Sequence, residues 1–332
     1  MIDQTVYIES KRTYPYYNLA LEEYLLDNVG ERQIILYLWQ NKHTVVIGKN
    51  QNSWKECKIR ELEGDGGYLV RRLSGGGAVY HDLGNLNFTF LIPTELYDLD
   101  KQLEVILTAV RMLGLDAVKS GRNDILIDGM KFSGNAFLER GGKSYHHGTL
   151  MVNVCLQDLQ KYLNVDREKL KSKSVDSVRA RVANLTEFYP TLTIEMLKDT
   201  LIQAFGVVYG VEPQKLNLNE SAEQSIKERE NRFASWEFKY GKKIEFQFEI
   251  ATRFVWGNIC MQFQVDRGKI KDVLVYSDAM KQDLISNIAD VLKGILFDKM
   301  EVIRLIKQYR CKDIAEEEML LDIINFIDKQ DF

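Results

Sequence analysis

Cysteine and proline are scarce in this chain of 332 residues, and each scarcity excludes a class of structure. The four cysteines, Cys57, Cys155, Cys260 and Cys311, lie far apart and form no CxxC pair. Neither a disulfide scaffold nor a zinc site of that type is therefore expected. Four prolines and the lack of any low-complexity tract argue against long disordered linkers. The composition, 45% hydrophobic and 28% charged, is typical of a globular protein of about two domains.

Signals for export, for membranes and for nucleic acid are also missing. The N-terminus has neither the basic stretch nor the apolar core of a secretory signal. No apolar run approaches the roughly 20 residues that a bilayer-spanning helix needs. The net charge of −4 gives no support to a broad basic surface for nucleic acid. We therefore expect a cytoplasmic protein that binds neither membranes nor nucleic acid.

Hydrophobic periodicity predicts a chain of the α+β class. A capping-box spacing at Ser53 predicts a helix that ends near Gly64, and Asp128-Gly129 predicts a hairpin between two short strands. Further helices are expected at 18–28, 98–113, 194–209, 220–231, 280–292 and 314–329. Strands are expected at 34–39, 44–47, 68–72, 78–80, 86–92, 125–127, 130–132, 144–154, 246–264 and 270–276. Because helices and strands do not alternate regularly, we expect mixed sheets flanked by helices over 1–240, a linker at 241–248 and a small α/β domain over 249–332.

A glycine-rich run follows two arginines: Arg71-Arg-Leu-Ser-Gly-Gly-Gly-Ala-Val-Tyr-His-Asp82. Glycines let a backbone approach a ligand closely, successive N–H groups can cradle an anion, and a guanidinium matches phosphate or carboxylate oxygens. A tight glycine hairpin with solvated arginines is the alternative. Neither common nucleotide motif fits, since Phe137 stands where a P-loop ending at Ser144 needs its first glycine. Tyr80 stands where the dinucleotide fingerprint needs its last glycine.

Three other polar clusters lie in the first half of the chain. The Asp-Gly hairpin would bring Asp124 near Lys131, a lysine in an otherwise apolar strand, where a cation is costly unless it meets an anion. The alternatives are a lysine that points to solvent and a carboxylate that serves a buried polar group. The histidines lack HExxH spacing, so metal binding has little support. His43 is expected to satisfy a loop, whereas His81 and His147 could line a pocket.

Taken in order, these motifs resemble those of the lipoate–protein ligases, in particular the bacterial two-domain enzymes. The resemblance covers the whole chain, and the tail from Trp236 on is similar to the family's accessory domain. It is carried by Tyr16-Tyr-Asn-Leu-Ala-Leu-Glu-Glu23, the glycine-rich run, Gly121-Arg-Asn-Asp124, Lys131-Phe-Ser-Gly-Asn-Ala136, His146-His-Gly-Thr149 and Ser177-Val-Arg-Ala-Arg-Val-Ala-Asn-Leu-Thr186.

The resemblance implies a biotin/lipoate ligase-like catalytic fold and a two-step reaction. Lipoate and ATP give lipoyl-adenylate and pyrophosphate, and a carrier lysine then displaces AMP. It implies Arg72 and Lys131 as catalytic residues, with Mg²⁺ arriving with ATP, near Asp124, rather than in a protein-only cage. For ATP or the adenylate it implies contacts with Arg72, Gly77, Ala78, Val79, Tyr80, Asn123, Asp124, Lys131 and Arg179. For lipoate it implies contacts with Arg72, Ser74, Gly75, Gly76, His81, Lys131 and His147.

The partners implied are lipoyl carrier proteins: the glycine cleavage H protein or acyltransferase subunits of 2-oxoacid dehydrogenases. The sequence leaves open which carrier is modified, and whether lipoate or octanoate is preferred. The basic stretch 163–182 matches a family loop that closes over the adenylate, and its charge could attract an acidic carrier. An ordinary solvated loop is the alternative. Two-domain members of the family are often monomers, which sets the expectation here.

Three other functions remain open from the residues. An octanoyl- or lipoyl-transferase would use a thioester on Cys155, which follows the His-His-Gly-Thr strand. A biotin ligase shares the two-step chemistry, but its glycine loop differs from the run seen here. A non-catalytic binder of a lipoyl-like ligand or carrier domain would not need Arg72 and Lys131.

Overall fold

The computed structural model describes residues 1–120, 124–164 and 182–332. These residues form two compact units. The first unit comprises Met1–Val46, Glu56–Arg71 and Val79–Lys239. The second comprises Ile47–Lys55, Arg72–Ala78 and Tyr240–Phe332. The second unit therefore includes two short segments from early in the chain, one of which holds the glycine-rich run.

An eight-stranded mixed sheet forms the centre of the first unit. Its order is β11 (Gln214–Lys215), β1 (Gln4–Glu9), β2 (Gln33–Trp39), β6 (Asn85–Pro93), β10 (Lys143–Met151), β9 (Met130–Arg140), β8 (Asp124–Ile127) and β7 (Ala117–Ser120). Strand β1 is parallel to β2 and β11, and the other neighbouring pairs are antiparallel. A second sheet has the order β4 (Tyr68–Arg71), β3 (Thr44–Ile47) and β5 (Val79–His81).

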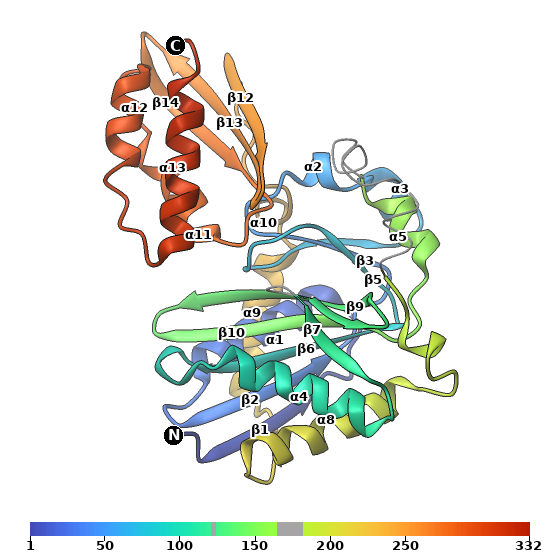
Figure 1. Cartoon of the computed structure of the whole chain (residues 1–332). Coiled ribbons are helices and arrows are strands. Elements are labelled where there is room, and N and C mark those ends of the chain that lie inside the picture. Colours follow the sequence, from blue (N-terminus) through green and yellow to red (C-terminus); the bar gives the residue numbers. More distant parts are fainter. Residues whose placement is uncertain (121–123, 165–181) are drawn as a thin grey trace. The chain divides into compact units, whose positions relative to one another are not determined.

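Helices cover both faces of the large sheet (Figure 1). Leu36 and Leu38 of β2 belong to a core shared with α4 (Leu99–Met112) and α8 (Ile194–Tyr209). Because side chains alternate along a strand, Tyr37 faces the other way, and its hydroxyl donates to Asn18 of α1 (Pro15–Asn28), 3.2 Å away. Helix α9 (Glu220–Ala234) packs on α1. Burial on two faces explains why β2 is almost continuously apolar.

Caps fix the ends of the two core helices close to where the sequence predicts them. The Asp98 side chain accepts the N–H of Lys101 at the start of α4. Thr193 does the same for Met196 in α8, which ends at Gly210 in the left-handed conformation. Shorter helices are α2 (Ser53–Glu56), α3 (Ile59–Gly64), α5 (Leu156–Tyr162), α10 (Trp236–Tyr240) and the 3-10 turns Thr94–Leu96 and Leu185–Glu187.

The predicted single helix from Ser53 to Gly64 is wrong, because the chain forms α2 and α3 instead. The cap of α2 is Asn52, whose side chain accepts the N–H groups of Trp54 and Lys55. Helix α2 ends before Cys57, which forms an isolated bridge with Leu163. A residue that pairs in this way leaves the helical conformation, and the hydrogen-bonding pattern of the helix is interrupted there.

The second unit contains a small three-stranded antiparallel sheet, as expected for the C-terminal part of the chain. Its strands are β12 (Phe248–Phe254), β13 (Gly257–Asp266) and β14 (Lys269–Tyr276). Three helices accompany them: α11 (Gln282–Val291), α12 (Lys299–Ile306) and α13 (Ile314–Asp328). Helix α12 is absent from the sequence prediction. The core of this unit joins side chains of the strands and the three helices, among them Phe263, Ile288, Ile303 and Ile323.

Together the sheets and helices confirm the α+β class. None of the helices in the described part of the chain has the length and apolar character that crossing a bilayer requires.

Candidate functional site

The predicted hairpin brings Lys131 and Asp124 together in the first unit. Its turn residues have positive φ, 50° at Asp128 and 77° at Gly129, as a two-residue hairpin turn requires. Lys131 Nζ lies 2.6 Å from Asp124 Oδ1, and 35% and 42% of the two side chains are exposed. An ammonium beside a single carboxylate, with access to solvent, can be offered to the anionic group of a ligand.

The main chain of Lys131 makes a second connection. Its carbonyl accepts the N–H of Ala183 at 3.0 Å, and Lys131 forms an isolated parallel bridge with Val182. The basic stretch 163–182 is thus joined to the first unit at both ends, through Leu163 and Val182. Two predicted site residues, Asn123 and Arg179, lie outside the described residues, as does most of that stretch.

His147 belongs to a buried polar group that sequence reasoning identified only in part. Its Nδ1 lies 2.8 Å from Glu22 Oε1, and the Thr89 hydroxyl donates to the same oxygen at 2.7 Å. Trp39 Nε1 in turn donates to Thr89 Oγ1 at 3.1 Å. All four residues are buried, and a buried carboxylate needs such donors. The acidic pair in the apolar helix was the available signal for Glu22, whereas Thr89 and Trp39 gave none.

The neighbouring His146 lies in the core on the opposite side of β10. Burial, followed by the charge of His147, lowers the pKa of His146 to about 3, so its ring is neutral. Asn135 Oδ1 and Gln102 Oε1 lie 2.8 and 3.1 Å from its two nitrogens. A neutral imidazole has only one N–H to donate. Gln102 Nε2 has no partner among the described residues. If the Gln102 amide were rotated by 180°, its N–H would donate to the unprotonated nitrogen of His146, and both the amide nitrogen and the imidazole would be hydrogen-bonded.

Tyr80 and His81 lie on β5, also in the first unit. His81 Nδ1 is 3.4 Å from Asn41 Nδ2, and both residues are buried. The Tyr80 hydroxyl donates to Asp158 Oδ2 at 3.5 Å. Burial and then the charge of Asp158 raise the pKa of Tyr80. The His43 ring packs edge-on against Tyr80, in keeping with a structural role for that histidine.

Arg72 organises the glycine-rich run within the second unit. Its Nε donates to Ser74 Oγ at 3.0 Å, and its Nη2 donates to the carbonyls of Gly75 and Gly77 at 2.6 and 2.8 Å. Arg72 is buried. The guanidinium therefore fixes the shape of the loop by binding two of its carbonyls and one of its hydroxyls.

Two glycines of the run are needed for close packing. Gly76 has a φ of 90°, and its N–H donates to the carbonyl of Ala279 at 3.1 Å. A Cβ at position 75 would lie 2.4 Å from the Ala279 carbonyl oxygen and 2.8 Å from that of Met280. The two glycines thus allow another backbone segment of the same unit to pack closely against the run. The sequence predicted instead that the glycines allow a ligand to approach.

Arg71, the first arginine of the pair, supports the end of α10. Its Nε donates to the carbonyl of Phe238 at 3.0 Å, and its Nη2 donates to that of Lys239 at 2.9 Å. A guanidinium suits these carbonyls, because the last turn of a helix leaves them without internal partners. The adjacent arginines therefore have separate structural roles.

The predicted site residues divide between the two units. Within the first unit the structure pairs Lys131 with Asp124 and places His147 on Glu22. The remaining residues of the first unit are Val79, Tyr80 and His81, all on β5, and those of the second unit are Arg72, Ser74, Gly75, Gly76, Gly77 and Ala78.

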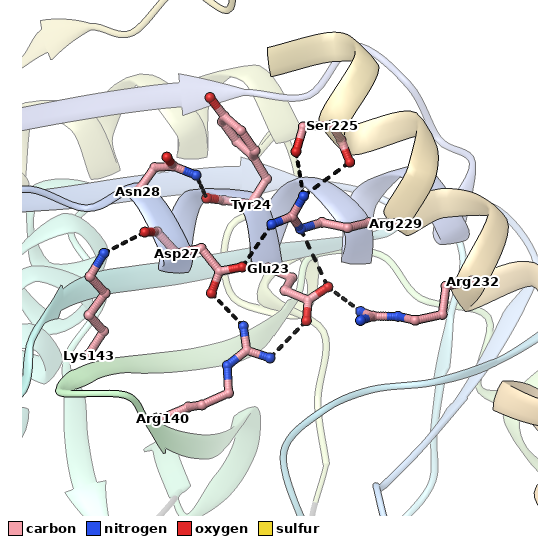
Figure 2. Close-up of polar contacts among 9 residues, drawn as sticks. All are labelled: Glu23, Tyr24, Asp27, Asn28, Arg140, Lys143, Ser225, Arg229 and Arg232. Atoms are coloured by element: carbon pink, nitrogen blue, oxygen red, sulfur yellow. Dashed lines mark hydrogen bonds and ion pairs between the residues drawn. The ribbon is translucent and has the colours of Figure 1, made fainter. Parts of the chain in front are cut away.

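A charged cluster at the end of α1 was not predicted (Figure 2). We call Glu23, Asp27, Arg140, Arg229 and Arg232 the arginine cluster. Arg140 donates to Glu23 Oε1 at 2.8 Å and to Asp27 Oδ1 at 2.6 Å; Arg229 binds Asp27 Oδ2 at 2.9 Å, and Arg232 binds Glu23. Burial alone would raise the pKa of Asp27, but hydrogen bonds from Arg229 and Arg140 hold it below its ordinary value. The cluster lines a recess of about 500 Å³ and joins α1 to α9 and to the β9–β10 hairpin.

Among the described residues, neither Cys155 nor the acidic and histidine side chains form a thioester or metal site of a familiar kind. The Cys155 side chain is exposed, and its main-chain N–H donates to Asp82 Oδ2 at 2.8 Å. The hydrogen-bond partners described above for the histidines are amides and a carboxylate rather than a thiol. Among residues 1–120, 124–164 and 182–332, no group of three His, Cys, Asp or Glu side chains is placed to hold a metal ion.

Comparison with known proteins identifies relatives along almost the whole chain. Residues 14–206 match the family described as lipoyl protein ligase A/B catalytic domain, and residues 243–327 match the bacterial lipoate protein ligase C-terminus. The lipoate-protein ligase A of Psychrobacter cryohalolentis is 41% identical over 303 residues, which cover 89% of each protein.

Solved structures give the same result for the fold. Plasmodium falciparum LipL1 in complex with lipoate has a TM-score of 0.86 and 29% identity, over 98% of this chain and 99% of that one. A bipartite lipoate protein ligase from Thermoplasma acidophilum, studied with its E2 lipoyl domain, has a TM-score of 0.65 and 27% identity over 74% of this chain and 99% of that one. A lipoate-protein ligase A bound with ATP has a TM-score of 0.64 and 26% identity, over 73% of this chain and 99% of that one. With both its catalytic and its C-terminal regions matched, the chain belongs to the lipoate–protein ligase family.

Proposed function

We propose that this chain activates lipoate with ATP and then transfers the lipoyl group to a lysine of a carrier protein. Family membership supports the reaction. The single observation that carries the residue assignment is the half-exposed Lys131 ammonium, 2.6 Å from Asp124. The likeness to ligases solved with lipoate and with ATP supports the two substrates.

In the first step, a carboxylate oxygen of lipoate attacks the α-phosphorus of ATP. A carbon–oxygen–phosphorus anhydride forms, and pyrophosphate leaves with the electrons of the broken P–O bond. Two anions must meet for this to occur, so the site has to supply positive charge in a fixed position. Lys131 and Arg72 are the proposed sources, with Lys131 also meeting the lipoate carboxylate.

The remaining assignments follow the family resemblance residue by residue. For lipoate we propose Ser74, Gly75, Gly76, His81 and His147, the last oriented by its bond to buried Glu22. For ATP and the adenylate we propose Gly77, Ala78, Val79, Tyr80, Asn123, Asp124 and Arg179, together with Arg72 and Lys131.

In the second step, the carrier amine attacks the carbonyl carbon of the anhydride. An amide bond forms, AMP leaves, and the amine loses a proton. The anhydride is already activated, so no enzyme nucleophile is required. Cys155 is therefore dispensable, and replacing it with serine should leave transfer unchanged.

Magnesium fits as an ion that enters with ATP. Asp124 offers one partly exposed carboxylate, and Mg²⁺ is commonly held by one or two carboxylates together with substrate phosphates. When bound, the ion supplies neutralisation of phosphate charge.

We further propose a monomeric cytoplasmic enzyme with a catalytic region over 1–240, a linker at 241–248 and an accessory region over 249–332. Its carriers would be the glycine cleavage H protein or acyltransferase subunits of 2-oxoacid dehydrogenases. The acid would be lipoate or octanoate.

The decisive experiment measures lipoate-dependent exchange of pyrophosphate into ATP, followed by mass spectrometry of a lipoyl domain. The wild-type chain should catalyse the exchange and add one lipoyl group to a single lysine. Lys131→Met should lower exchange by at least about 100-fold, the typical loss on removing one charge-stabilising donor. Lys119→Met is the matched control, because Lys119 lies on the nearby strand β7 and pairs with Asp100.

Two outcomes would contradict the proposal in different ways. Absence of lipoate-dependent exchange with the wild-type chain would contradict the function itself. Undiminished exchange by Lys131→Met would leave the function standing and remove Lys131 from its assigned role.

A further inference from the structure

Strand β9 carries one extra residue directly after Lys131. Along β8 and β9 the register pairs Ile127 with Met130 and Leu126 with Lys131, and it then shifts so that Ile125 pairs with Ser133. Phe132 therefore has no residue opposite it, which defines a β-bulge. Bulges occur beside functional sites, where they change the direction of a side chain.

The bulge decides which residue lies opposite Asp124. In a regular hairpin with this turn, Asp124 would face Ser133. With the extra residue it faces Gly134 instead. Since alternation restarts after the bulge, Gly134 lies on the same face as Lys131 and Asp124, although an i, i+3 pair in a regular strand points to opposite faces.

Gly134 leaves the space through which the Lys131 side chain passes. A Cβ on residue 134 would lie 3.3 Å from both Cε and Nζ of Lys131, closer than ordinary van der Waals contact. A serine at this place would press on the ammonium that reaches Asp124. The backbone of Gly134 does not require a positive φ, so the lack of a side chain answers a need for space.

Thr149 completes the arrangement from the neighbouring strand. The register of β9 and β10 ends at the pair Asn135–Gly148, just before Gly134. The Gly134 N–H donates instead to Thr149 Oγ1 at 3.3 Å. The last residue of the His-His-Gly-Thr motif therefore supports the same glycine.

The displaced serine indicates that the bulge carries a cost. Ser133 is fully buried opposite Ile125, and its Oγ has no hydrogen-bond partner among the described residues. A regular register would instead place this hydroxyl on the partly exposed face. A buried orphan hydroxyl beside the bulge is expected if the irregular register serves Lys131.

We propose that Gly134 and Thr149 are positioning residues for Lys131, and that the bulge at Phe132 exists to bring Gly134 beneath the ammonium. This inference rests on the proposed role of Lys131 in adenylation. It gives the position of one lysine a local structural cause, namely a space without a side chain next to a backbone N–H that one hydroxyl holds.

The test compares Gly134→Ala, Thr149→Val and Thr149→Ser with the wild-type chain in lipoate-dependent ATP–pyrophosphate exchange. Gly134→Ala should lower kcat by about 10- to 100-fold, because misplacing a reacting group by up to an ångström has effects of this size. Thr149→Val should lower kcat as well, while Thr149→Ser, which keeps the acceptor, should retain most of it. The KM for ATP and the thermal midpoint should change little. Gly64→Ala is the control, since its Cβ would meet no atom within 4 Å.

Each outcome either supports or overturns the positioning role of Gly134 and Thr149. Wild-type kcat in Gly134→Ala overturns the inference, and so does equal loss in Thr149→Val and Thr149→Ser. If Gly134→Ala does not fold, the two Thr149 variants decide alone. If wild type exchanges and Lys131→Met does not, while Gly134→Ala matches wild type, only the inference fails and the proposed function stands.

Discussion

Ser133 places a hydroxyl in the core of the first unit, where the described residues offer it no partner. A buried hydroxyl without a hydrogen bond is destabilising relative to an apolar group of the same size. Ser144, on the adjacent strand β10, is also buried, but its hydroxyl lies 2.8 Å from that of Thr94. The two serines therefore form a natural pair for measuring the cost of an unsatisfied hydroxyl.

Ser133→Ala should stabilise the protein by about 1 kcal/mol, because it removes an unpaired polar atom. Ser144→Ala should destabilise it by about 1 kcal/mol, because Thr94 loses its partner. Urea unfolding of both variants measures the two changes. Destabilisation of similar size in both variants would show that Ser133 is hydrogen-bonded in solution.

At this scale the sequence predicts some contacts and not others. Lys131 and Asp124 could be paired in advance, because an Asp-Gly turn sets a short hairpin and its register. The contact of Glu22 with His147 could not, because a helix and a strand distant in sequence meet there. Arg72 was expected to face a ligand, yet its guanidinium also binds carbonyls of its own loop, a contact that residue type alone does not specify.

Helix α1 shows how burial on several sides changes an element. Glu22 and Glu23 are adjacent and both buried, one directed to the sheet and the other to the arginine cluster. The helix begins at Pro15 rather than at the predicted Asn18, since proline is well suited to the first turn. Its boundary was missed because the apolar pattern that marks helices on a surface is absent from one enclosed on most sides.

Glu23→Gln should destabilise the protein by about 2 kcal/mol, because Arg232 loses its carboxylate partner. Arg140 loses one of its two carboxylate partners and keeps Asp27. The exposed ion pair between Glu104 and Arg111 supplies the control, and Glu104→Gln should cost under about 1 kcal/mol. Urea unfolding at low and moderate salt measures both. Equal small effects would mean that the cluster contributes no more than a surface ion pair.

The bulge in β9 marks the limit of prediction for strands. Both flanks of the Asp-Gly turn read as β-structure in the sequence, and both are strands. Nothing in the letters Lys-Phe-Ser-Gly signals that Phe132 stands alone, because the shift depends on packing against β8 and β10.

For the whole molecule, acid sensitivity follows from two groups with lowered pKa values. His146 has an ordinary pKa of 6.5, which burial and the charge of His147 lower to about 3. Above pH 6.5 the ring is neutral in the folded and unfolded states, and its contribution to stability is complete. As pH falls from 6.5 toward 3, only the unfolded chain gains the proton, so stability is lost. Asp27, whose pKa is also lowered, adds loss below its ordinary value of 3.8.

The free energy of unfolding should therefore fall between pH 6 and 4, with His146 contributing up to about 1.4 kcal/mol per pH unit. His146→Gln removes that titration, so its stability should depend less steeply on pH over the same range. Urea unfolding at several pH values, at constant ionic strength, compares the two proteins. Identical slopes would show that the imidazole is protonated in the folded state.

The family and the overall class could be recognised from motifs, because several short patterns occur in a fixed order. The grouping of Ile47–Lys55 and Arg72–Ala78 with the C-terminal residues could not. More than 150 residues separate these segments from the C-terminal part of the second unit, and no local sequence pattern predicts that they pack with it. Helix α12 was missed for a simpler cause: eight residues give a weak periodic signal.

The close approach of Gly75 to the carbonyls of Ala279 and Met280 limits which substitutions this motif can accept during evolution. Any side chain at position 75 would clash with a neighbouring segment of main chain, and this clash does not depend on which nucleotide or acid the protein binds. Homologues that dispense with the C-terminal region should be released from this penalty. Alanine or serine should then be tolerated at the corresponding place, and a glycine retained there would point to a different constraint.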